Sequence, residues 1–481
     1  MLAFIFLVST GALAQTSRPN ENDMFGAPQK SVNRDQEGLE SSKPAHDAFA
    51  SGEVIDNALQ IGGLLYQRFN YSVLKNSGAS NDPVSMPTQF DMYLDARPND
   101  RVRGFVDARF LYDSSRDQYG NTGSGTGAAS AQYSSGSSAP SGLSTANTAV
   151  VNPQTVIDQA WLKFDVDRTV FVTAGKQHVK WGTSRFWNPT DVLSTQKRDP
   201  LIPYDLRLGT NMVKVALPLE GKKSGLYAIT LLENTTPAST AGQLGEALRA
   251  ETVIANAEMG VDAVYRFNTA PVYGADISAP LGPVDVYLEG AYVASAPGAH
   301  YDLVPNGFTS GSDLANEYTQ AQNQQSAAQV SGGVNYSFGW RENRLATVGV
   351  EYFYNQLGYK DARSYPVLIF LNQYQPFYTG REYAAFYLTA EGPDSEKHTS
   401  YTFSTLANLS DSSYISRVDF SWRFLTYLTF DAFVDDHYGR PGGEFNFALN
   451  TPAMTYHGSN IPATSVPATV VDLGVALRLA F

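Results

Sequence analysis

Histidine and acidic side chains are the first candidates for chemistry in this sequence, which has six His and no Cys. The His residues are scattered without paired metal-ligand spacing, so we predict no metal site and no cofactor. The lack of Cys excludes disulfides, thiolate ligands and thiol nucleophiles. In one cluster, Asp435-Asp436-His437, an Asp–His pair could activate water. Charged neighbours at a strand end are more often a solvated rim, and we therefore expect no enzymatic activity.

A second group of reactive side chains lies in residues 175–193, which read GKQHVKWGTSRFWNPTDVL. This stretch is unusually rich in Trp, Phe, Arg and Asp for a loop that faces open water. We expect it to fold back into the interior of the molecule, where its charges would pair with charges on the surrounding wall. An aromatic rim at the membrane surface is the alternative. The candidate constriction residues are Lys180, Trp181, Arg185, Phe186, Trp187, Asn188 and Asp191.

The elements that must position these residues are predicted to be β-strands. Aromatic residues make up 12% of the chain, and 40 Gly and 25 Pro favour strands and turns. Apolar and charged residues alternate along many segments, as where Val106 and Phe110 alternate with Asp107 and Arg109. One face of such a strand suits lipid and the other suits water.

The connections between these segments alternate in length. Tight turns near residues 98–100 and 165–167 flank a long Gly/Ser-rich stretch at 114–152, and similar alternation follows. The predicted strands lie near 60–74, 88–97, 101–113, 154–166, 168–178, 209–218, 225–235, 258–268, 284–294, 328–340, 345–358, 381–391, 398–409, 414–424, 427–437 and 467–481. The predicted fold is all-β: a single transmembrane antiparallel β-barrel of about 16 strands, with short periplasmic turns and long extracellular loops. Fourteen or eighteen strands are the alternatives, depending on the Pro-rich stretch from Val272 to Ala279.

The N-terminal region is predicted to direct export. An apolar run, Leu2 to Val8, is followed by Ala12-Leu13-Ala14, the small-x-small spacing of a signal-peptidase site. The run is too short to span a membrane as a helix. We therefore predict a signal peptide at residues 1–14, a polar periplasmic extension at 15–58 and the barrel at 59–481.

Charges on the polar strand faces are predicted to line the lumen. Opposed rows of both signs would order water and favour small polar solutes. Pairing across neighbouring strands is the alternative for part of them. The net charge of −13 argues against a nucleic-acid partner. The predicted lumen wall comprises Arg68, Asp91, Asp95, Arg103, Asp107, Arg109, Glu351, Arg417, Asp419, Arg423 and Asp431.

The last segment carries the most specific signal. Val475, Leu477, Leu479 and Phe481 alternate with small or charged residues, and the sequence stops on the Phe. This pattern resembles the C-terminal assembly signal that the barrel-insertion machinery of bacterial outer membranes reads. Residues 59–481 as a whole resemble bacterial porin-like outer-membrane barrels. The Gly-Lys-Gln, Trp-Gly and Asn-Pro-x-Asp elements within residues 175–191 are similar to a motif of poorly characterised porin and export barrels.

The resemblance implies a place in the outer membrane of a Gram-negative bacterium, with both termini in the periplasm. It implies contact with outer-membrane lipid, lipopolysaccharide and the insertion machinery, with a homotrimer as one mode of assembly. The implied function is passive diffusion of small hydrophilic solutes or ions through a channel narrowed by an inward-folded third loop. The alternative is transport or export of a lipid, hydrophobic or polysaccharide substrate with periplasmic partners. A lipid exporter would have an apolar lumen or a lateral gap between strands.

Overall fold

The computed structural model describes residues 58–115, 152–194, 196–202, 207–219, 223–233, 240–296, 299–303, 313, 316, 318–322, 325–341, 344–371, 373–393, 398–456 and 459–481. Within these ranges the main sheet has nineteen strands. Eighteen form a closed antiparallel barrel, because β1 (Leu59–Leu74) pairs with β3 on one side and with β25 on the other. The nineteenth, β2 (Val84–Ser85), lies outside the ring and pairs with β1. The predicted signal peptide and all but the last residue of the extension lie outside the described residues.

The other barrel strands follow one another around the ring in sequence order. They are β3 (Pro87–Asn99), β4 (Val102–Asp113), β5 (Gln154–Val166), β6 (Val170–Gln177), β7 (Thr210–Leu219), β8 (Ser224–Leu231), β9 (Gly245–Ile254), β10 (Ala257–Tyr265), β11 (Val272–Leu281), β12 (Val284–Ala296), β15 (Gln325–Arg341), β16 (Arg344–Asn355), β17 (Glu382–Glu391), β18 (Thr399–Asn408), β19 (Ser413–Leu425), β20 (Leu428–Gly439) and β25 (Thr469–Ala480). In the described part of the chain, no helix is long and apolar enough to span a membrane.

The prediction of sixteen strands is wrong, and the alternative of eighteen is correct. The two strands that were missed are β9 and β11. The sequence of β9 is rich in Ala, Glu, Leu and Arg, which favour helices and hide its alternation. β11 contains Pro280, which pairs near the β11–β12 turn, where a missing amide donor interrupts the ladder least.

The two faces of each strand differ sharply in burial. Val418 and Val475 are 49% and 45% exposed, whereas Arg417 and Asp472, charged residues on the same two strands, are 2% and 4% exposed. The apolar face therefore points outward and the charged face points into the barrel. Because the side-chain period of a strand is two, the register that turns one charge inward also turns inward the residues two and four positions away.

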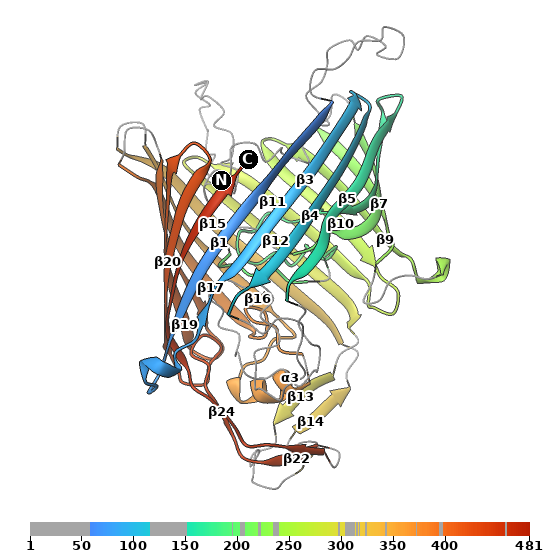
Figure 1. The fold of residues 1–481 in the computed structure, drawn as a ribbon. Coiled ribbons are helices and arrows are strands. Elements are labelled where there is room, and N and C mark those ends of the chain that lie inside the picture. Colours follow the sequence, from blue (N-terminus) through green and yellow to red (C-terminus); the bar gives the residue numbers. More distant parts are fainter. Residues whose placement is uncertain are drawn as a thin grey trace, which may run out of the picture.

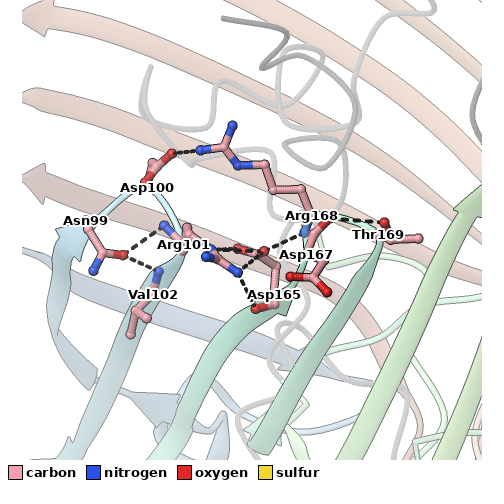
Figure 2. A network of polar contacts seen from close by, with 8 residues as sticks. All are labelled: Asn99, Asp100, Arg101, Val102, Asp165, Asp167, Arg168 and Thr169. Atoms are coloured by element: carbon pink, nitrogen blue, oxygen red, sulfur yellow. Dashed lines mark hydrogen bonds and ion pairs between the residues drawn. The ribbon is translucent and has the colours of Figure 1, made fainter. Parts of the chain in front are cut away.

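Short turns at one end of the barrel are held by side chains as well as by the ladder. Asn99 Oδ1 accepts hydrogen bonds from two backbone amides of the β3–β4 turn, both at 2.9 Å. Arg101 forms an ion pair with Asp165 at 3.1 Å, and Arg168 forms one with Asp100 at 3.1 Å, so two neighbouring hairpins are joined (Figure 2). These contacts join the β3–β4 and β5–β6 turns.

The opposite end carries the long loops and their small elements, and the C-terminus lies at the short-turn end (Figure 1). A hydrophobic cluster there unites residues of the β12–β15, β16–β17 and β20–β25 connections, with Tyr365, Leu368 and Phe447 among its buried members. The loop elements are η1 (Ala79–Asn81), η2 (Ala241–Gln243), β13 (Ala299–Leu303), β14 (Tyr318–Gln322), η4 (Ala362–Ser364), α3 (Tyr365–Phe370), β21 (Leu449–Thr451), β22 (Met454–Tyr456), β23 (Ser459–Ile461) and β24 (Thr464–Val466).

The seam of the barrel is closed by the residues of the predicted assembly signal. Val475, Leu477 and Leu479 face outward on β25, which pairs with β1 from Leu64↔Ala480 to Leu74↔Thr469. Phe481 exchanges two backbone hydrogen bonds with Gly63, at 2.9 and 3.1 Å. A Cβ on Gly63 would lie 2.7 Å from the Phe481 ring, so this glycine lets the terminal ring approach the β1 backbone.

Candidate functional site in the barrel interior

The β6–β7 loop (residues 178–209) contains the predicted constriction residues. Trp187 and Leu193 are fully buried, and Trp181 and Phe186 are nearly so. Phe186 and Trp187 pack in one cluster with residues of β16 to β19. Trp181 and Leu193 pack in a second cluster with residues of β7 to β10. The loop therefore contacts inward-facing side chains of the wall over a large part of the ring.

Glu351, on β16, binds three consecutive backbone amides of this loop. Arg185 N and Trp187 N each lie 2.8 Å from a carboxylate oxygen, and Phe186 N lies 3.1 Å from Oε1. The hydroxyl of Tyr287 donates a further hydrogen bond at 2.8 Å. This buried carboxylate is thus satisfied largely by the loop backbone, through charge-assisted hydrogen bonds.

Glu289, on β12, binds the preceding part of the loop. Its Oε2 accepts hydrogen bonds from Thr183 N at 2.5 Å and Ser184 N at 3.1 Å. Gly182 has a φ of +93°, and a Cβ there would lie 2.3 Å from Glu289 Oε2. Glycine is required at this position for both reasons. The two glutamates together hold residues 183–187.

Aromatic packing adds to these hydrogen bonds. The Trp187 ring stacks on Phe353 with centroids 5.7 Å apart, and its indole N–H donates to Phe377 O at 2.9 Å. The Arg185 guanidinium lies 3.9 Å from the centroid of the Tyr387 ring, close enough for a cation–π interaction. The loop is therefore joined both to the wall and to the β16–β17 connection.

The remaining predicted loop residues occupy different environments. Trp181 packs in the cluster beside β7 to β10, and Lys180 is exposed. The Asn188 side chain donates to a backbone carbonyl four residues earlier, at 2.7 Å. Asp191 forms an ion pair with Arg207 at 2.8 Å, within the same loop. These last two contacts hold the loop in a compact shape.

Asp199 lies in the second half of the loop. Its carboxylate accepts a hydrogen bond from Leu201 N at 2.9 Å. Burial raises the pKa of Asp199 to about 6, although this hydrogen bond and the charges of Arg417 and Arg198 act in the opposite direction. The charge on this part of the loop therefore changes near pH 6.

Wall charges on β3 to β5 form ion pairs across neighbouring strands. Arg109 lies 3.2 Å from Asp91 and 3.1 Å from Asp158, and Arg103 lies 2.9 Å from Asp95. Pairing of opposite charges across neighbouring strands is the alternative given above for part of the wall charges, and these contacts are of that kind.

Wall charges on β19, β20 and β25 form ion pairs both along and across strands. Arg417 pairs with Asp419 at 2.8 Å and with Asp435 at 2.9 Å, and Arg478 approaches Asp431 at 3.5 Å. Of the other predicted wall residues, Arg68 and Asp107 are buried and Arg423 is half-buried.

The Asp435-Asp436-His437 cluster is divided between the two faces of β20. Asp436 is exposed on the outward face, whereas Asp435 and His437 are buried on the inward face. His437 Nε2 lies 3.0 Å from Asp472 Oδ2 and its Nδ1 lies 2.8 Å from Phe445 O. His437 thus ties the β20–β25 loop to the wall. Across the described ranges, no group of three His, Asp or Glu side chains is placed to hold a metal ion.

A buried polar network underlies the long loops. Glu444 accepts hydrogen bonds from the Tyr383 hydroxyl at 2.6 Å, from Asn408 Nδ2 at 2.7 Å and from Phe377 N. Its own backbone amide donates to Asp411 Oδ2 at 2.8 Å. Burial, with the nearby Asp411 carboxylate, raises the pKa of Glu444 to about 8. Glu444 is therefore mainly protonated at neutral pH.

Two parts of the site were missed by sequence reasoning. Phe353, on which the loop residue Trp187 stacks, lies on an inward face of β16 that also carries Thr347, Glu351 and Asn355, and a large aromatic residue on such a polar face is a usable signal. Tyr387 lies on an inward face of β17 beside Tyr383 and Ala385, where it does not stand out. Asp158 gives no such signal, because its position depends on an irregularity in the pairing of β4 and β5.

No protein-family model and no curated protein sequence matches this chain. Solved structures to which this chain is similar include OccAB1 of Acinetobacter baumannii, with 10% sequence identity and a TM-score of 0.48 over 88% of this chain and 96% of that chain. OprB of Pseudomonas putida, in a high-pH structure, has 9% identity and a TM-score of 0.43 over 90% and 97%. A triple mutant of Rhodopseudomonas blastica porin has 10% identity and a TM-score of 0.39 over 88% and 100%.

Proposed function

We propose that this protein is a channel in the outer membrane of a Gram-negative bacterium, through which small hydrophilic solutes or ions diffuse passively. The barrel exposes a continuous apolar outer face, which a soluble protein rarely does and a lipid-facing wall requires. Its inner face is charged, and a ring of this many strands is wide enough to enclose an aqueous channel.

We further propose that the β6–β7 loop, the third long connection, narrows this channel. The observation that carries the proposal is the binding of three successive loop amides by the inward-facing Glu351. The loop packs against β7 to β10 and β16 to β19 and is bound by Glu289 on β12, so the channel would run along the wall formed by β20, β25, β1, β3 and β4. That wall carries paired charges of both signs, which favour polar solutes over apolar ones.

For orientation, we propose that the short-turn end faces the periplasm and the long loops face outward, as the general layout of such barrels suggests. For assembly, we propose a homotrimer. The outward residues of β6 to β9 are aliphatic, small or polar, such as Val172, Val215 and Leu248, and none is aromatic. A face without the aromatic belt of a lipid interface suits contact with another copy. Chemical cross-linking in native membranes tests this assembly.

Export of lipid is less well supported. Every neighbouring pair of barrel strands is joined over at least seven register positions, and the shortest ladders are β5–β6, β6–β7 and β10–β11. Within the described residues this pairing provides no lateral gap. The charged inner face also does not suit an apolar substrate.

Single-channel recording in planar bilayers tests the proposed function. Folded protein should give stepwise conductance, and reversal potentials in asymmetric salt should report its charge preference. Sugar uptake by proteoliposomes should show a size limit. A correctly folded barrel that conducts no ions and admits no sugars would contradict the proposal.

A further inference from the structure

We propose that Asp158 is the positioning residue that directs the β6–β7 loop into the lumen, by binding both ends of the loop. This inference rests on the proposed function of the loop. It uses a different set of contacts from the glutamates that bind the middle of the loop.

Asp158 owes its position to a β-bulge. The β4–β5 register runs through Asp107↔Gln159 and then continues at Ala108↔Ile157, so Asp158 is an extra residue on β5. A bulge bends its strand and re-aims a side chain. Here the Asp158 side chain is 3% exposed and faces the interior.

The two ends of the loop meet at this carboxylate. His178 follows β6 directly, and its Nε2 lies 2.9 Å from Asp158 Oδ1. Gly209 directly precedes β7, and its amide lies 3.2 Å from Asp158 Oδ1 and 3.2 Å from Asp158 O. The second oxygen, Oδ2, pairs with Arg109 on β4 at 3.1 Å. Asp158 therefore links the loop ends, at β6 and β7, to β5 and to β4.

These contacts give the loop a direction. The β6–β7 ladder ends at Gln177↔Thr210, and a plain hairpin would continue outward along the strand axes. Attachment of both chains to the inward face of β5 turns them towards the lumen instead. A Cβ on Gly209 would lie 2.7 Å from Asp158 O, so glycine is needed for this approach.

Fixed ends also assist the anchors in the middle of the loop. Glu289 and Glu351 bind residues 183–187, and each bond must overcome the entropy of ordering the segment. With both ends held by Asp158, that entropy cost falls. Loss of the Asp158 contacts should therefore weaken the binding of distant loop amides that Asp158 does not touch.

Hydrogen exchange of the Arg185, Phe186 and Trp187 amides, measured on the folded full-length barrel in detergent, tests this inference. Asp158→Ala and Gly209→Ala should each speed exchange at these amides by about tenfold or more, because charge-assisted contacts at the loop ends are lost. Asp158→Asn retains an acceptor for the Gly209 amide and should restore most of the protection. Asp165→Asn, on the same strand but at the short-turn end, is the matched control and should change nothing.

Unchanged protection in a folded Asp158→Ala barrel would overturn the inference. If that variant does not fold, Gly209→Ala decides the question, since it leaves every charge in place. Conductance of the same samples separates the two proposals. A wild-type barrel that does not conduct would refute the channel, while the exchange rates would still decide the role of Asp158.

Discussion

Replacing Glu351 with Gln should loosen the β6–β7 loop without unfolding the barrel. In the native protein, both carboxylate oxygens accept hydrogen bonds from loop amides, those of Arg185, Phe186 and Trp187. The amide of Gln has one acceptor oxygen, and its NH₂ group would face donors. At least one buried backbone amide then loses its acceptor, and the others lose the charge that strengthens their hydrogen bonds.

The size of the effect follows from these contacts. An unsatisfied buried donor costs about 1–3 kcal/mol, and hydrogen bonds to charged groups contribute about 1.5–3 kcal/mol, roughly twice a neutral one. The free energy that holds the loop against the wall should therefore fall by about 3 kcal/mol. This shifts the equilibrium between bound and released loop towards release by roughly 100-fold. The barrel itself should persist, because its ladder hydrogen bonds are untouched.

Open-channel current is the assay for this prediction. Glu351→Gln should show greater current noise and excursions to higher conductance, together with faster exchange of the three loop amides. The matched control is Glu391→Gln, which removes a glutamate from β17, where Glu391 Oε2 accepts a hydrogen bond from Leu345 N of the neighbouring strand. A quiet Glu351→Gln channel with wild-type conductance and wild-type amide exchange would refute the anchoring role.

Three further predictions concern assembly and pH. Phe481→Asp should leave unfolded protein in the periplasm, because the terminal ring and its contact with Gly63 close the seam; normal amounts of heat-modifiable barrel on unboiled gels would show otherwise. Since the pKa of Glu444 is raised above its usual value, its stabilising effect is greatest below about pH 4.5 and is lost as the pH rises to about 8. The protection of amides in the long loops, measured against the intrinsic exchange rate at each pH, should therefore fall between pH 6 and 9 in the wild type but not in Glu444→Gln. An equal pH dependence of protection in both would be contrary evidence. Since the pKa of Asp199 is about 6, acidification from pH 7 to 5 should remove its negative charge and shift the reversal potential towards lower cation preference. Asp199→Asn should abolish the part of this shift that Asp199 causes. An unchanged shift in the variant would exclude Asp199 as its source.

Alternation along the strands was enough to predict most of the barrel. Each of the sixteen predicted segments overlaps an observed strand, with residues 154–166 and 414–424 matching Gln154–Val166 and Ser413–Leu425 closely. These segments combine β-branched or aromatic residues on one face with charges on the other. β9 and β11 lack that contrast, because Ala, Glu and Pro weaken both the propensity and the pattern.

The interior contacts could be predicted only in part. The density of Trp, Arg and Asp in residues 180–191 indicates a loop that needs partners, and Glu351 was expected on the wall. That Glu351 would bind Trp187 N is not readable from the sequence, since the two residues are 164 positions apart and their approach depends on the closure of the whole ring. The contacts of Asp158 with both ends of the loop depend on a single β-bulge. The bulge shifts the strand register by one residue, and nothing in the residue composition predicts it.

The most direct test of the central claim is to replace residues 180–199 with a short Gly/Ser linker and measure permeation. Heat-modifiable migration would first establish that the variant folds. Conductance and the uptake of sugars of increasing size would then be compared with those of the wild type in the same membranes. A loop that narrows the channel predicts larger conductance and a higher size limit. Unchanged conductance and an unchanged size limit in the folded variant would contradict the account.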